Sequence, residues 1–95
     1  MYTVSSLLYE ETARRLRDAI GSRSYFSGSV RFVFEGTECR LTLSAVIYLS
    51  RREMPEGAFE AIDEIVPVWW EFHTSDEYGE MLNDFSFSAL REHLL

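Results

Sequence analysis

The sequence contains a single cysteine, Cys39, and no lysine. One cysteine excludes an intrachain disulfide and a cysteine-based metal site built from this chain alone. The chain also lacks the run of about 18 apolar residues that a membrane-spanning helix needs, and its N-terminal residues lack the cationic start and continuous apolar segment of a signal peptide. These absences predict a cytoplasmic protein that does not enter a membrane.

Motifs of the common catalytic and cofactor sites are missing as well. The sequence has no glycine-rich phosphate loop, no nucleophile elbow and no zinc-ligand spacing. Small domains without such motifs are more often binding modules, adaptors or inhibitors than enzymes. We therefore expect no cofactor, and we favour a non-enzymatic domain that works by protein contact.

Glu71 and His73 are the one candidate pair for catalysis. They are two residues apart in a predicted strand, so they share a face and could bind a metal ion or act as a base and its orienting partner. Asp84 on a neighbouring strand could join them. A functional metal site usually needs three protein ligands with supporting hydrogen bonds, and the other histidine, His93, falls in the predicted last helix. A metal-dependent enzyme is therefore our third interpretation.

The net charge of −7 is unevenly distributed along the chain. Residues 1–52 contain eight arginines and five acidic residues, a net charge of +3, whereas residues 53–95 contain one arginine and eleven acidic residues, a net charge of −10. A phosphate backbone would repel this second half, so we do not expect direct binding of nucleic acid. The charge asymmetry has two interpretations. The negative charge keeps the protein soluble, and the two halves interleave in the fold so that their opposite charges partly compensate. Alternatively, the protein is an acidic regulator that mimics nucleic-acid charge and occupies a basic DNA-binding protein.

Length and composition predict one domain over residues 1–95. A chain of 95 residues, 46% of them hydrophobic and 15% aromatic, is long enough for one core without disulfides and too short for two. Residues 5–20 have the periodicity of an amphipathic helix, which Ser5 or Ser6 can cap at the N-terminus and Gly21 at the C-terminus. Its apolar stripe comprises Tyr9, Ala13, Leu16 and Ile20.

Two alternating segments after the linker at residues 21–28 predict a β-hairpin. A two-residue turn at Gly36 and Thr37 would have glycine at the first position of a type II′ turn. Counting back from that turn places six apolar side chains on one face, in the facing pairs Phe34/Cys39, Phe32/Leu41 and Val30/Leu43. On that face the Cys39 thiol would behave as a small buried hydrophobe.

The remaining segments complete an α+β fold. We expect the second strand to run through Leu49, residues 51–57 to form a polar loop, a third strand to begin near Ile62, and residues 80–84 to form a short fourth strand. Asp84 or Ser86 would cap a last helix over residues 87–94. The sum is an antiparallel meander of three or four strands, in the order α-β-β-β-(β)-α, with both helices on one face of the sheet.

Residues 65–72, IVPVWWEF, are apolar on both faces of the third strand. Strict alternation assigns Val66, Val68, Trp70 and Phe72 to the core and leaves the intervening side chains on the other face. Pro67 cannot donate a ladder hydrogen bond, so the strand is an edge strand, a bulged strand or two shorter strands.

The sheet face opposite the helices is the predicted contact surface. Its apolar residues would be covered either by a protein partner, with a homodimer as the simplest case, or by the chain itself, through a loop at residues 50–60 or through a helix. The predicted partner-binding residues are Val33, Val46, Tyr48, Ile65, Pro67 and Trp69.

Overall fold

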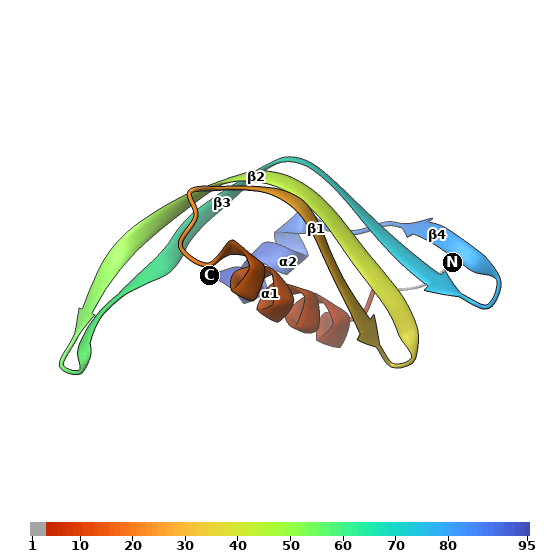
Figure 1. The fold of residues 1–95 in the computed structure, drawn as a ribbon, viewed down its shortest axis with the longest axis horizontal. Coiled ribbons are helices and arrows are strands. Elements are labelled where there is room, and N and C mark those ends of the chain that lie inside the picture. The colour runs from red at the N-terminus through yellow and green to blue at the C-terminus, as the bar shows by residue number, and fades with distance from the viewer. Residues whose placement is uncertain (1–3) are drawn as a thin grey trace.

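A computed structural model describes residues 4–95 and shows a four-stranded antiparallel sheet, in the strand order β1-β2-β3-β4, with two helices on one face (Figure 1). This confirms the predicted α+β fold, its fourth strand and the common side of the helices. The elements are α1 (Ser6–Ile20), β1 (Tyr25–Phe34), β2 (Thr37–Met54), β3 (Gly57–Asp76), β4 (Gly79–Asn83) and α2 (Phe87–Leu94).

The sheet is bent into an arch, and the two helices lie on its concave side (Figure 1). We call this side the covered face and the convex side the outer face. The strands β2 and β3, of 18 and 20 residues, form the long axis of a molecule that measures 50 × 26 × 18 Å. The bend lets one sheet wrap around both helices while its outer face remains uncovered by any described element.

α1 begins and ends at the predicted caps. The Ser5 Oγ accepts a hydrogen bond from the Leu8 N–H at 3.2 Å, which satisfies one of the free donors of the first turn. At the other end Gly21 has a φ of +59° and donates its N–H to the Arg17 carbonyl at 3.1 Å. Neither α1 nor α2 is long and apolar enough to span a membrane.

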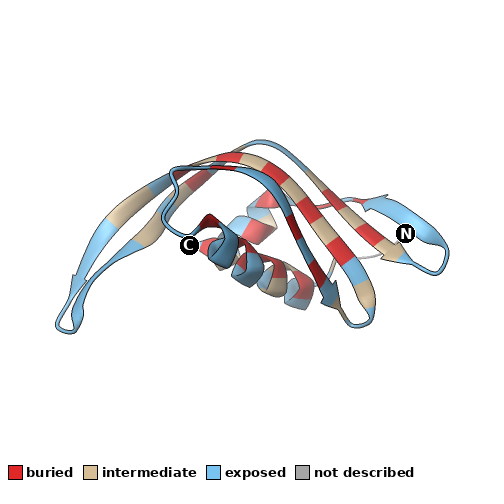
Figure 2. Ribbon diagram, in the orientation of Figure 1, coloured by how far each residue is buried: buried red, intermediate tan, exposed pale blue. Residues whose placement is uncertain are grey.

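The core lies between the covered face and the helices (Figure 2). Phe72 of β3 is at its centre, with a fully buried side chain whose ring stacks on Phe85 at 4.6 Å between centroids. Tyr9 of α1 packs on the other side of Phe85 at 4.9 Å. The segment between β4 and α2 therefore contributes to the core rather than only connecting two elements.

The turn between β1 and β2 lies one residue earlier than predicted, which shifts the pairing of the two strands by two residues. Phe34 pairs with Thr37, so the turn residues are Glu35 and Gly36, with φ of +50° and +78°. Two positive φ values are typical of a type I′ turn, which matches strand twist as well as type II′ does. Phe32 consequently faces Cys39. A slip of two residues keeps every side chain on its predicted face, so the predicted composition of the packed face holds.

The predicted polar loop at residues 51–57 is wrong, and so is the predicted start of the third strand near Ile62. β2 continues to Met54, and β3 begins at Gly57, directly opposite Met54, after a two-residue turn. We call residues 51–60, which are exposed on both sides of this ribbon, the arm. It projects beyond the helices at one end of the molecule (Figure 1). An arm without a buried face lacks the apolar alternation that identifies a strand.

A β-bulge at Val68 reverses the predicted faces of the adjoining residues. Trp69 pairs with Ser44 and Pro67 pairs with Ala45, so Val68 has no partner on β2. The bulge puts Ile65 on the covered face, where 1% of it is exposed, and leaves Val66 and Val68 45% and 67% exposed. The predicted core positions of Val66 and Val68, and the predicted outer position of Ile65, are therefore wrong.

Pro67 lies where β3 has no second neighbour. β4 pairs with β3 only from Phe72 to Asp76, and within the described chain no strand borders β3 on that side before Phe72. β3 is thus an interior strand from Phe72 to Asp76, where β4 borders it, and an edge strand at Pro67. Prolines in sheets are found mainly on edge strands, because an edge residue can lack its N–H without losing a hydrogen bond between strands. Two of the three alternatives left by the sequence, an edge and a bulge, are both realised.

Trp70 is a core residue only in part. It lies on the covered face, as predicted, with its ring 5.5 Å from that of Phe87 and its Nε1 donating to the Phe85 carbonyl at 3.0 Å. Part of the ring remains exposed. The helix α2 that it contacts has the predicted bounds, and the Ser86 Oγ accepts the capping bond from the Ala89 N–H at 3.2 Å.

Candidate contact surface

The outer face carries a continuous apolar patch at the top of the arch. Tyr25 of β1, Val46 of β2 and Val66 of β3 face one another in a single row across the three strands. Trp69 lies in the next row on one side, opposite Ser44, and Tyr48 in the next row on the other side, opposite Glu64. We call Tyr25, Val46, Tyr48, Val66 and Trp69 the outer patch.

Most of the outer patch is open to solvent. Tyr48 is 56% exposed and Trp69 is 48% exposed, and only Val46, in the middle, is largely covered by its neighbours. Large apolar side chains that are about half exposed and lie in adjoining rows form a patch of the kind that is often functional on a monomeric protein. Exposed tyrosine and tryptophan side chains grouped around a valine centre have the composition of an interface core.

Three of the six predicted contact residues belong to the outer patch: Val46, Tyr48 and Trp69. Val33 is exposed on the outer face, as predicted, but it lies near the β1–β2 turn, opposite Glu38 and apart from the patch. Ile65 is buried in the core, and Pro67 lies opposite the buried Ala45 on the covered face. Both placements follow from the bulge. The unpaired Val68 lies between these residues and Phe72, whose face was predicted correctly, so Ile65 and Pro67 each point to the face opposite to the predicted one.

Sequence reasoning missed Tyr25 and Val66. The predicted linker at residues 21–28 includes Tyr25, although Phe26, Gly28 and Val30 continue the alternation of the hairpin back to it, and Phe26 is buried. The aromatic pair Tyr25–Phe26 was the signal for an earlier strand start. Strict alternation places Val66 in the core. Pro67 indicates an edge or a bulge in this strand, but it does not show that Val68 is the residue without a partner.

A shallow hollow of about 360 Å³ lies on the outer face near the β1–β2 turn. Arg31, Arg40 and His73 line it from three successive strands in one row. Arg40 forms an ion pair with Glu80 of β4, and Glu38 also lines the hollow. Positive and negative groups thus balance locally, which argues against a strong site for either an anion or a cation.

Glu71 and His73 lie side by side on the outer face, with the His73 Nε2 3.7 Å from the Glu71 Oε2. Over residues 4–95, no group of three or more histidine, cysteine, aspartate or glutamate side chains is close enough to hold a metal ion, so Asp84 does not complete the pair. Cys39 is buried on the covered face, as predicted, and burial raises the pKa of its thiol.

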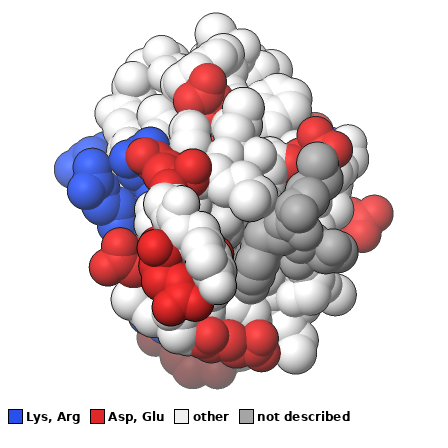
Figure 3. Space-filling model, turned by 90° about the vertical axis from the view of Figure 1, so that its right-hand side faces the viewer, with Lys and Arg blue, Asp and Glu red and all other residues white. Residues whose placement is uncertain are grey.

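Acidic side chains gather at the end of the molecule opposite the arm. The β1–β2 and β3–β4 turns lie next to each other there, because Glu38 of β2 pairs with Ser75 of β3. Figure 3 shows this end, with acidic groups spread over most of the view and basic groups at one side. The acidic residues of the two turns are Glu35, Glu38, Asp76, Glu77 and Glu80.

Comparison of the chain with models of known protein families, with curated proteins and with solved structures gives no significant match.

Proposed function

We propose that this chain is a protein-contact domain that self-associates through the outer patch. The observation that carries the proposal is the row of Tyr25, Val46 and Val66, flanked by Trp69 and Tyr48, on a sheet face that no described element covers. Burying this surface in a second copy removes exposed aromatic area from water. A two-fold contact also needs no second gene product.

The curvature of the sheet limits the strength of such a dimer. Two convex faces touch at the top of their arches and diverge toward their ends (Figure 1). A contact limited to the top of each arch is small, and small interfaces are typical of transient complexes. We therefore expect a weak, reversible dimer.

Substitutions in the patch test the proposal. Trp69→Ser and Val66→Ser are each expected to raise the dissociation constant of the dimer by about tenfold or more, because central aromatic and aliphatic side chains dominate contact energies. Sedimentation equilibrium at protein concentrations from micromolar to millimolar measures the effect. Tyr78→Ser, at a fully exposed turn far from the patch, is the matched control. A wild-type protein that stays monomeric throughout, or an equal effect of Tyr78→Ser, would refute self-association through this patch.

A second candidate function follows from the acidic end of the molecule. An acidic regulator would use the side chains of the two neighbouring turns to occupy a basic DNA-binding protein. A poly-arginine peptide serves as a probe, and its binding is expected to weaken steeply with salt and to be reduced when Asp76 and Glu77 are both replaced by their amides. Salt has little effect on apolar dimerisation, so titration at two ionic strengths separates the two functions. Binding that does not respond to salt would contradict the regulator.

A further inference from the structure

The two open edges of the sheet differ in their capacity to pair with another strand. The open side of β3, before Phe72, contains Pro67, the bulge at Val68 and a second register shift beside Asp63. Glu64 in the same stretch is held by Arg91 of α2. Prolines, bulges and inward-held charges are the devices that prevent one sheet edge from joining another.

The edge formed by β1 has none of these devices. All ten of its residues, Tyr25–Phe34, pair with β2 in one unbroken register. The strand contains no proline and a single charged residue, Arg31, and it is rich in aromatic and β-branched residues. Within residues 4–95 no strand borders its outer side, so the N–H and C=O groups on that side form a template for a further strand.

We propose that β1 pairs in antiparallel fashion with β1 of a second copy, so that two sheets join into one of eight strands. The contact is distinct from the outer patch, and it places the outer patches of both copies on one continuous face. The proposal therefore concerns a second surface of the chain and does not depend on the function proposed above.

Symmetry and the covered face restrict the register of this pairing. A two-fold axis perpendicular to the sheet keeps the helices of both copies on the same side, so outer-face residues must lie opposite outer-face residues. Near the middle of β1, two registers meet this condition, with either Ser29 or Val30 facing itself across the axis. The first also brings Phe26 opposite Phe32, whereas the second brings Gly28 opposite Phe32.

The register with Ser29 on the axis makes the better cross-strand pairs. It forms the aromatic pair of Phe26 and Phe32 on the covered face and the pair of Tyr25 and Val33 on the outer face, each twice by symmetry. The isolated charge is also accommodated, because Arg31 then lies opposite a serine of the second copy. We therefore assign this register to the pairing.

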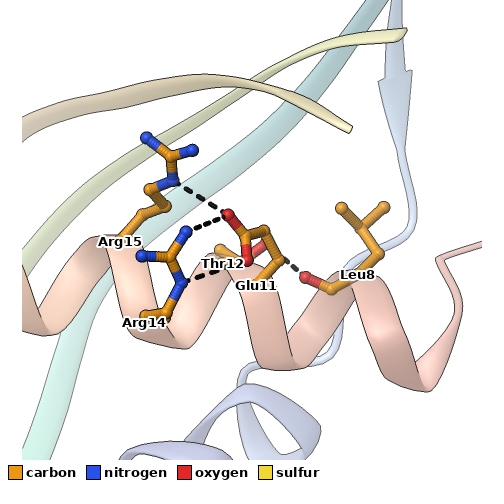
Figure 4. Close-up of polar contacts among 5 residues, drawn as sticks. All are labelled: Leu8, Glu11, Thr12, Arg14 and Arg15. Atoms are coloured by element: carbon orange, nitrogen blue, oxygen red, sulfur yellow. Dashed lines mark hydrogen bonds and ion pairs between the residues drawn. The ribbon is translucent and has the colours of Figure 1, made fainter. Parts of the chain in front are cut away.

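The charges on the flank of α1 are compatible with the same arrangement. α1 lies beneath β1, with the Arg15 guanidinium carbon 5.9 Å from the centroid of the Phe32 ring. Glu11 accepts hydrogen bonds from Arg14 and Arg15, which hold its pKa at about 2, so it is ionised at neutral pH (Figure 4). Two-fold symmetry makes the two α1 helices antiparallel, so this flank meets the same Glu11, Arg14 and Arg15 of the second copy. The flank carries charges of both signs and is therefore compatible with the pairing.

Disulfide trapping tests the proposed register directly. In a Cys39→Ala background, Ser29→Cys is expected to form a disulfide-linked dimer under mild oxidation, because residues facing across an antiparallel pair have Cα atoms about 4.5–5.5 Å apart. Non-reducing electrophoresis and mass spectrometry measure the product. Ser44→Cys is the matched variant: it lies on the same face, one strand inward and beside Trp69. Tyr78→Cys, at an exposed turn, measures the rate of random collision.

The three variants separate the two contacts. Trapping of Ser29→Cys at least about tenfold faster than Tyr78→Cys supports edge pairing, whether or not Ser44→Cys is trapped as well. Trapping of Ser44→Cys alone supports contact through the outer patch and overturns the edge proposal. Ser29→Cys at the collision rate also overturns it, whatever Ser44→Cys does. Circular dichroism of each variant verifies that the exposed substitutions leave the fold intact.

Discussion

Replacing Phe72 with alanine is expected to lower the free energy of unfolding by about 3–5 kcal/mol. The Phe72 side chain is completely buried and its ring stacks on Phe85, so truncation removes apolar contacts and leaves a cavity that neither the sheet nor the helices can close. A loss of that size is a large fraction of the total stability of a domain of this length.

Urea denaturation followed by circular dichroism measures this loss. Phe72→Leu keeps most of the buried volume and is expected to cost about 1–2 kcal/mol, so it provides a value if Phe72→Ala does not fold. Val68→Ala, on the same strand but on the exposed bulge, is the control and should change stability by less than about 0.5 kcal/mol. A cost below about 1 kcal/mol for Phe72→Ala would contradict its central place in the core.

Two adjacent residues of β3 are expected to differ strongly when each is replaced by alanine. Ile65→Ala should cost about 2–4 kcal/mol, because Ile65 is buried opposite Ile47 on the covered face. Val66→Ala should cost less than about 1 kcal/mol, because nearly half of Val66 is exposed. Urea titrations at a low micromolar concentration, where a weak dimer is dissociated, give both values.

The order of these two costs reports on the bulge. A regular strand counted back from Phe72 without an extra residue would bury Val66 and expose Ile65. A larger loss for Val66→Ala than for Ile65→Ala would therefore contradict the bulge at Val68.

The faces of the β1–β2 hairpin could be predicted from the sequence, whereas its register could not. The period of two in Val30 to Phe34 and in Cys39 to Leu43 determines which side chains share a face. Glu35, Gly36 and Thr37 allow two turns that differ in register by two residues, and both preserve those faces. Apolar patterning cannot distinguish these two turns. The turn that occurs is the one in which Glu35 and Gly36 both adopt positive φ.

The bulge and the arm were harder to predict for opposite reasons. Residues 65–72 are apolar on both faces, so an extra residue there leaves no irregularity in the pattern. Residues 51–60 are exposed on both faces, so they lack the alternation that a half-buried strand shows. Alternation of apolar and polar residues identifies a strand that has one buried face. It does not determine the faces of a strand that is apolar on both sides, and it does not detect a strand that is exposed on both sides.

The bulge explains the two wrong faces among the predicted contact residues. Val46, Tyr48 and Trp69 were placed correctly on the outer face. Val46 and Tyr48 follow from the alternation of β2, and Trp69 lies on the same side of the bulge as Phe72. Ile65 and Pro67 lie beyond the bulge, so their faces were exchanged. That the outer patch binds a partner stays a prediction.

The arm allows this fold to vary in length without cost to its core. Each residue added to or removed from both strands of the arm moves the turn at Pro55 and Glu56 but leaves every pair between β2 and β3 in the body unchanged. One such pair changes the reach of the arm by about 3.3 Å. Matched insertions and deletions at residues 51–60 are therefore the changes in chain length that the protein should tolerate best, whereas a single unmatched residue would shift the register of one strand against the other.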